Sequence, residues 1–126
     1  MKLQKHETTR QLGAVVKYEV DQNYTRKSAD FTNGGGEAVQ LQPGVLFTGG
    51  DTPVVFDTAA AEDVTGICLS TESVDPGETV LIVWLSDGPA IVNANEVDFP
   101  EDAAQRTAIE VALTAKGIKL VNGLDV

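Results

Sequence analysis

The stretch T-V-L-I-V-W-L at Thr79–Leu85 decides the fold class. After its first residue it is continuously apolar, and its residues are mostly β-branched or aromatic, which is typical of a central strand covered on both faces. Turn signals flank it, D-P-G at 75–77 and D-G-P at 87–89. We therefore expect a β sheet built around this strand, with residues 90–97 as its hairpin partner.

On both sides of this strand the chain consists of short apolar segments separated by turn residues, a pattern that is typical of an antiparallel or mixed β body. Residues 57–63 are rich in alanine and predict a loop or a single helical turn. The predicted strands around the central one are residues 38–41, 45–47, 53–56, 64–70 and 118–121.

Residues 101–116 change to a helical period. Pro100 and the acids after it favour a helix start, Asp98 with Glu101 is a candidate capping box, and Gly117 is a stop. This helix has a small-residue face, which predicts close packing against its own sheet or a neighbouring subunit. Its predicted members are Ala104, Ala108, Val111, Ala112 and Ala115, with Ile109 and Leu113 beside them. The expected class is α+β, mostly β.

The N-terminal part differs from the body. Residues 1–12 are mostly polar, and after Met1 their only large apolar side chains are Leu3 and Leu12, too few to offset the entropy of ordering. The run A-V-V-K-Y-E-V at 14–20 alternates as a strand does, residues 24–31 read as extended, and G-G-G at 34–36 marks a junction. We predict a flexible arm over residues 1–33 and a compact domain over residues 34–126.

Composition and charge exclude several classes. The chain has 126 residues and a net charge of −10. Residues 31–126 hold 3 basic against 15 acidic side chains, a balance of −12 that repels phosphate backbones, so no nucleic-acid partner is expected. No apolar window is long enough for a membrane span, and no signal-like stretch follows Met1.

Candidates for catalysis are few. His6, the only histidine, lies in the predicted arm, and with Cys68 it cannot build a zinc site, so we expect no metal, cofactor or disulfide. Cys68 follows Ile67 in a predicted strand and reads as a packing residue, while Trp84 reads as a core residue or a subunit contact. Most aspartates lie at turns and caps. A binding or assembly role is favoured over an enzyme.

An arm on a compact body suits strand addition to a partner's sheet edge. Ordering ten residues costs about 10 to 20 kcal/mol of backbone entropy, so a single arm binds weakly. Several arms on one closed oligomer make the later attachments intramolecular, which favours a trimer or a similar ring.

The order of motifs resembles a known family, the head decoration (cement) proteins of tailed bacteriophages. The resemblance covers residues 42–121. Its motifs are Q-P-G-V-L-F, V-V-F-D, G-I-C-L, L-I-V-W-L-S-D-G-P-A-I-V-N, and F-P-E-D-A-A-Q-R-T-A-I-E-V-A-L-T-A-K-G-I-K-L-V. Their order and spacing carry the likeness, above all the Pro-led alanine-rich helix followed by G-I and a terminal strand.

The resemblance implies a β-tulip-like decoration fold and homotrimers on local threefold axes of the capsid exterior. It also implies an arm that becomes ordered against the major capsid protein. Proteins of this family lock neighbouring capsomers after the shell expands, resist the pressure of the genome and catalyse nothing. The protein would be made in the bacterial cytoplasm and reside on the virion. For the arm we expect capsid contacts from Val15, Val16, Lys17, Tyr18, Val20, Tyr24, Arg26, Lys27 and Phe31. For the trimer interface we expect Trp84, Pro100, Arg106 and Ile109.

Two alternatives remain open. A phage tail or fibre β module that binds a cell-surface glycan requires exposed aromatic side chains, for which Trp84, Tyr18 and Tyr24 are the candidates. A small carboxylate-dependent hydrolase requires paired acids in a pocket.

Overall fold

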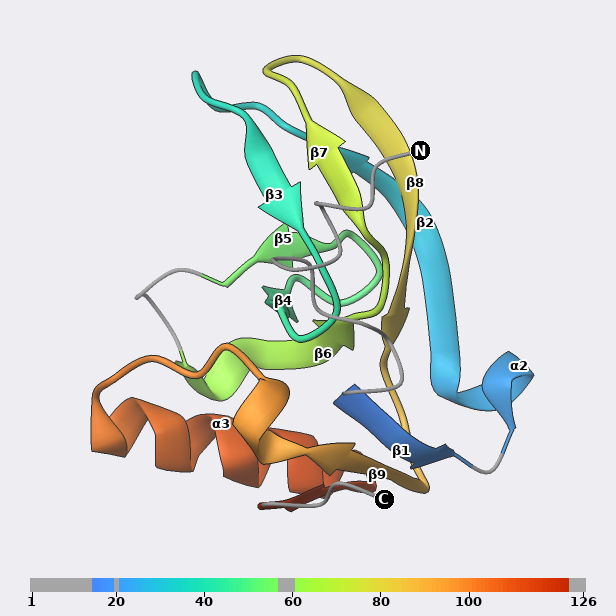
Figure 1. Cartoon of the computed structure of the whole chain (residues 1–126), viewed down its shortest axis with the longest axis vertical. Helices are drawn as coiled ribbons and strands as arrows, with labels where there is room; N and C mark the ends of the chain where they lie inside the picture. Colours follow the sequence, from blue (N-terminus) through green and yellow to red (C-terminus); the bar gives the residue numbers. More distant parts are fainter. Residues whose placement is uncertain (1–14, 20, 57–60, 123–126) are drawn as a thin grey trace, which may run out of the picture.

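A computed structural model describes residues 15–19, 21–56 and 61–122 of the chain. The body is mostly β with one long helix, as expected (Figure 1). Its larger sheet has five strands in the order β2-β8-β6-β4-β5, and all of its pairings are antiparallel. The bounds of these strands are β2 Arg26–Thr32, β4 Leu46–Thr48, β5 Val54–Val55, β6 Val64–Cys68 and β8 Thr79–Leu85.

Strand β8 has the bounds that the apolar run predicts. It lies between β2 and β6, so its main chain pairs on both sides. Its two faces serve different cores, with Ile82 and Trp84 on one and Leu85 on the other. The expectation of cover on both faces is wrong at Leu81, which is 65% exposed because it lies on the face of Val83 and Leu85, where the first core does not extend beyond Val83.

A second sheet has the order β1-β9-β10, formed by Val16–Glu19, Ala90–Asn93 and Ile118–Val121. Strand β9 runs antiparallel to β1 and parallel to β10. The predicted hairpin of β8 with β9 is therefore wrong. The segment between β8 and β9 binds the C-terminal end of the long helix instead of forming a hairpin turn. Gly88 N donates a hydrogen bond to the Lys116 carbonyl at 2.8 Å, and Ala90 N donates one to the Gly117 carbonyl at 3.2 Å.

The remaining strands, β3 (Val39–Leu41) and β7 (Glu72–Val74), form a two-stranded sheet. Strand β7 was not expected from the sequence, because only one of its three side chains, Val74, is buried and no alternation is visible. Short helical segments are α2 Gln22–Thr25, η2 Ala61–Asp63 and η3 Ala94–Glu96.

The long helix α3 spans Ala103–Ala115, inside the predicted range. Its N-cap is Asp102, whose Oδ1 accepts from Ala104 N at 2.8 Å and Gln105 N at 3.3 Å, so the predicted capping box of Asp98 with Glu101 is wrong. The helix packs on its own body through the fully buried Ile109 and Leu113. Most of the alanine-rich side faces outward instead.

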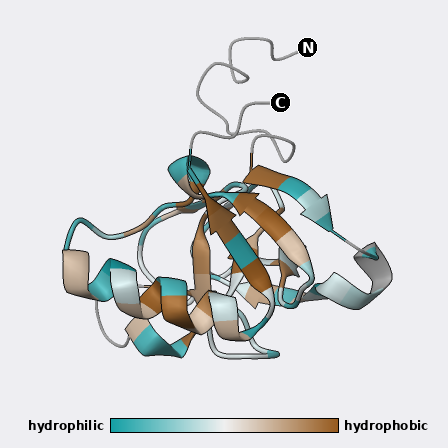
Figure 2. Ribbon diagram, turned by 90° about the horizontal axis from the view of Figure 1, so that it is seen from below, coloured by the Kyte–Doolittle hydropathy of each residue, from teal (hydrophilic) through white to brown (hydrophobic). Residues whose placement is uncertain are grey.

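Two clusters of side chains form the interior. One lies among α3, the three-stranded sheet and part of the larger sheet; the other contains Phe31, Phe47, Cys68 and Trp84. The rings of Phe47 and Trp84 meet edge to face at 6.2 Å, and those of Phe31 and Phe47 stack at 6.3 Å. Figure 2 shows the strongly apolar segments gathered on the strands in the middle of the molecule. The predicted packing role of Cys68 is confirmed.

The expected flexible arm is wrong for the residues that the structure describes before Asn33. Strand β1 pairs with β9, and β2 pairs with β8 over seven residues. Val15 is fully buried in the first cluster and Phe31 is 6% exposed in the second. These contacts bury enough apolar surface to offset the ordering entropy. Residues 1–14 and 20 lie outside the described residues, so the described body begins at Val15.

Candidate attachment face

The described chain begins and ends at the same end of the three-stranded sheet. Val16, the first residue of β1, is opposite Val92, and Val121, the last residue of β10, is opposite Asn93. Because β1 enters antiparallel to β9 and β10 runs parallel to it, both chain ends lie where β9 ends. We call this end of the sheet, Val16, Val92, Asn93 and Val121, the terminal end.

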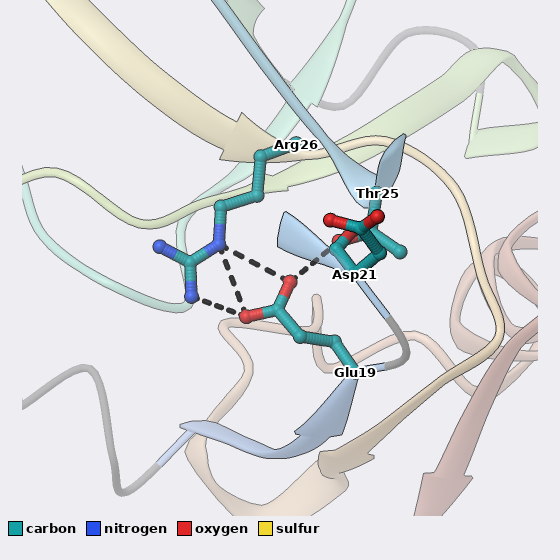
Figure 3. Close-up of polar contacts among 4 residues, drawn as sticks. All are labelled: Glu19, Asp21, Thr25 and Arg26. Atoms are coloured by element: carbon teal, nitrogen blue, oxygen red, sulfur yellow. Dashed lines mark hydrogen bonds and ion pairs between the residues drawn. The ribbon is translucent and has the colours of Figure 1, made fainter. Parts of the chain in front are cut away.

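A polar cluster fixes β1 at the opposite end of this sheet (Figure 3). Glu19, the last residue of β1, accepts from Arg26 Nε, which lies 3.1 Å from both carboxylate oxygens, and from Arg26 Nη2. The Thr25 hydroxyl lies 2.5 Å from Glu19 Oε2 and 3.0 Å from the Asp21 carbonyl oxygen. The cluster therefore ties the end of β1 to the start of β2.

The environment of Glu19 favours its charged form. Burial acts to raise the pKa of this carboxyl, but hydrogen bonds from Arg26 and Thr25 and the attraction of Arg26 outweigh it, so the pKa is lowered from its ordinary value. The Thr25 carbonyl is also buried and accepts from Ser86 N at 2.8 Å and Asp87 N at 3.1 Å. Hydrogen bonds thus join this corner to the end of β8.

The charge of the chain changes at the terminal end. Residues 1–14 contain Lys2, Lys5 and Arg10 against Glu7, a balance of +2. Residues 15–126 hold 6 basic and 18 acidic side chains, a balance of −12. A basic segment is therefore joined to an acidic body at the terminal end, and such a segment complements an acidic partner surface.

Few of the predicted attachment residues present their side chains to a partner. Tyr18 on β1 and Tyr24 on α2 are exposed, at 53% and 66%. Lys27 is exposed, and its Nζ forms an ion pair with Asp51 Oδ1 at 2.9 Å, whereas Arg26 forms an ion pair with Glu19. The others are buried or half-buried in the body, apart from Val20, which is not described: Val15, Val16, Lys17 and Phe31.

The predicted trimer-interface residues divide in the same way. Trp84 and Ile109 are 1% and 0% exposed within the chain's own interior, so their prediction as subunit contacts is wrong. Pro100 and Arg106 are half-buried at the surface. The Arg106 guanidinium lies 4.5 Å from the Phe99 ring centroid, and its Nε lies 3.3 Å from Glu110 Oε2. Strand pairing and burial, which decide these outcomes, are invisible in local sequence patterns.

Within the described residues, no group of three or more His, Cys, Asp or Glu side chains is placed to hold a metal ion. Burial raises the pKa of the Cys68 thiol to about 12, although a hydrogen bond to the Ser70 carbonyl acts in the opposite direction. The thiol is therefore protonated at neutral pH, which leaves it a poor nucleophile. No helix in the described part of the chain is long and apolar enough to cross a membrane.

Searches against protein-family models and curated proteins find no match to this chain. The likeness to head decoration proteins therefore rests on the order of its sequence motifs. The terminal end could not be predicted from the sequence, because strand order and direction are needed to locate it.

Proposed function

We propose that this chain is a head decoration protein of a tailed bacteriophage, which binds the exterior of the expanded capsid as homotrimers at local threefold sites. The observation that carries the proposal is the terminal end, where the acidic body continues into a basic N-terminal segment. The mostly β body with one long helix agrees with the fold that the motif resemblance implies. This arrangement supports attachment through the chain ends.

In this proposal residues 1–14, rather than 1–33, bind the major capsid protein. The polar cluster of Glu19, Thr25 and Arg26 holds β1 in the body, so the attachment segment starts from a fixed point. Added as a strand at a capsid sheet edge, the segment gains main-chain hydrogen bonds, and its cations meet an acidic surface.

Three copies convert weak single attachments into a strong one, because the second and third segments bind intramolecularly. A protein that binds only the expanded lattice stabilises that lattice by mass action. Decoration then resists the outward pressure of the packaged genome without any catalytic step.

The test compares three proteins mixed with expanded and unexpanded heads of the matching phage, with bound copies counted after sedimentation. They are the full chain, a chain lacking residues 1–14, and a full-length variant with Lys2, Lys5 and Arg10 changed to Gln. We expect the full chain to bind expanded heads, the deletion to lose at least tenfold in affinity, and the Gln variant to bind more weakly with a smaller salt dependence. A deletion through Asp30 is unsuitable because it removes β1 and most of β2.

Circular dichroism of the deletion provides the control that the body still folds. Equal binding of the full chain and the deletion to both kinds of head would overturn the proposed attachment. A failure of the full chain to bind expanded heads would overturn the function itself.

A second candidate is glycan binding by a tail or fibre module, and one observation favours it. Tyr18 and Tyr24 are both more than half exposed, as sugar-stacking side chains need to be, whereas Trp84 is buried and cannot take part. Under this alternative, Tyr18→Ala and Tyr24→Ala abolish retention on host-cell polysaccharide. Under the decoration proposal, neither the protein nor these variants are retained.

A further inference from the structure

The most exposed residues of α3 carry no charge. Its exposed residues are Ala103, Ala104, Thr107, Val111, Thr114 and Ala115, and Val111 is 64% exposed. The solvent side of a surface helix ordinarily carries charged side chains, and this one belongs to a strongly acidic body. The two charged residues of the helix, Arg106 and Glu110, have side chains that are 40% and 39% exposed, and they pair with each other.

This face continues into a groove beside β10. One hollow of about 390 Å³ is lined by Thr107, Glu110, Val111, Thr114 and Ala115. A second of about 540 Å³ shares Glu110 and Thr114 and extends along residues 117–120. We call the two together the helix–strand groove. Among the strands that the structure describes, β10 lies at the edge of its sheet.

One positive charge, that of Lys119, lines the second hollow, and Lys116 immediately precedes the lining residue Gly117. Lys116 at the end of α3 and Lys119 on β10 form no ion pair with any described residue, whereas Arg26, Lys27 and Arg106 each do. A partner seated here is therefore favoured if it brings carboxylates. The chain's own residues 1–14 are a poor occupant, because their balance of +2 has the same sign as the two lysines.

A complementary surface lies on the outer side of β2 and β8. Leu81 is 65% exposed, and Asp30 is directly opposite it on β2, so the two side chains share one face. Asp30 is exposed and forms no ion pair within the described residues. Ser28 and Thr79 are also exposed on these strands. We call Leu81 with Asp30 the Leu81 ridge.

We propose that copies of this chain associate head to tail, with the Leu81 ridge of one copy seated in the helix–strand groove of the next. The apolar contact joins Leu81 to Val111, and the charged contact joins Asp30 to Lys119. The inference rests on the homotrimer of the proposed function and names its contact.

Two physical arguments favour a second copy as the occupant. Copies with a charge of −10 repel each other, so they approach most easily where one surface offers a cation and holds its one lining carboxylate, Glu110, paired with Arg106, and the other surface offers a carboxylate. A ring also needs two different surfaces on each subunit, because a heterologous contact closes into a ring, whereas a self-complementary contact forms a dimer. The groove and the ridge are such a pair.

The test measures mass in solution by light scattering over a range of concentrations. We expect the wild type to be a trimer, and Leu81→Asp and Val111→Asp to be monomers. The matched control is Val54→Asp, which changes a valine that is 51% exposed and lies outside both surfaces, and it keeps the trimer.

A charge exchange gives the sharper result. Asp30→Lys and Lys119→Glu each raise the trimer dissociation constant at least tenfold, and the double variant restores trimers because the pair is rebuilt with its signs reversed. Circular dichroism confirms folding of each variant. A monomeric wild type, trimers that persist in Leu81→Asp and Val111→Asp, or a double variant no better than the singles would each overturn the proposed contact.

Head binding by the same variants separates this inference from the proposed function. If the aspartate variants are monomers as expected but the wild-type trimer does not bind heads, the proposed contact holds and the proposed function is overturned. If both aspartate variants remain trimers and bind heads, the proposed function is supported and the proposed contact is overturned.

Discussion

Arg26 at the start of β2 binds Glu19 at the end of β1 through two of its guanidinium nitrogens, and so joins strands of two different sheets. The Glu19 side chain is 8% exposed and that of Arg26 is 20% exposed. The pair therefore holds the N-terminal strand in the body just where a free arm was expected.

Removal of this ion pair should destabilise the fold. Arg26→Met leaves a nearly buried carboxylate without its cation, and we expect a loss of about 2 kcal/mol in the free energy of unfolding. Urea unfolding at pH 7 measures it. The control is Lys27→Met, since the Lys27–Asp51 pair is exposed and is expected to contribute less than about 0.5 kcal/mol. Equal losses in the two variants would contradict the structural role of the pair.

The same pair predicts a dependence of stability on acid. The pKa of Glu19 in the folded chain is lowered from its ordinary value of 4.5, so the folded state binds this proton less readily than the unfolded state. Its stabilising effect is complete above pH 4.5 and is lost as pH falls through the folded pKa. The stability gap between wild type and Glu19→Gln should be constant from pH 6 to 8 and close below the ordinary value. A gap that widens in acid would show the opposite sign.

Gly66 is predicted to tolerate no side chain. A methyl carbon there would lie 2.5 Å from Trp84 Cδ1 and 2.6 Å from the Leu85 carbonyl oxygen. Gly66→Ala should therefore cost about 1 to 3 kcal/mol through overpacking. Gly36→Ala is the matched control, because nothing lies within 4 Å of that position and its effect should stay below about 0.5 kcal/mol. Thermal unfolding of both variants decides the matter.

Cys68 should be unreactive while the chain is folded. Its side chain is fully buried and its pKa is raised to about 12, so almost no thiolate is present at pH 8. Titration with an aromatic disulfide reagent should detect no thiol in native buffer and one thiol per chain in guanidinium. Rapid labelling of the native protein would show that the second cluster opens readily.

The N-cap of α3 makes a local prediction. Asp102→Ala removes the acceptor for Ala104 N and Gln105 N, and should cost about 1 kcal/mol. Glu101→Ala, one residue earlier, should change stability by only a few tenths of a kcal/mol. Chemical unfolding compares the two, and a larger loss at Glu101 would restore the capping box suggested by the sequence.

Local elements were predictable because their signals are local. Strand β8 follows from a continuous apolar run, and α3 from a change to helical period followed by Gly117. The packing role of Cys68 was predictable too, since its neighbours in sequence are apolar. Strand β7 was missed because a three-residue strand with one buried side chain has no period to detect.

The candidate site was far less predictable. The sequence predicts an arm over residues 1–33 because residues 1–12 are polar and G-G-G at 34–36 resembles a junction, although residues 14–20 and 24–31 have strand-like patterns. In the structure Phe31 enters an aromatic cluster with Phe47, sixteen positions later, and Trp84, more than fifty later. Such distant contacts leave no trace in the residues around Phe31.

The amino-acid order by itself determined the central strand, the long helix, the acidic body and the basic N-terminal segment, since each depends on the chemistry of neighbouring residues. Only the tertiary structure decided that β9 pairs with β1 and β10 instead of β8, and that the described chain begins and ends beside Val92 and Asn93. The physical reason is that a strand's side chains specify which of its faces is buried, whereas its partner and direction are chosen by hydrogen bonds and packing between segments far apart in the chain.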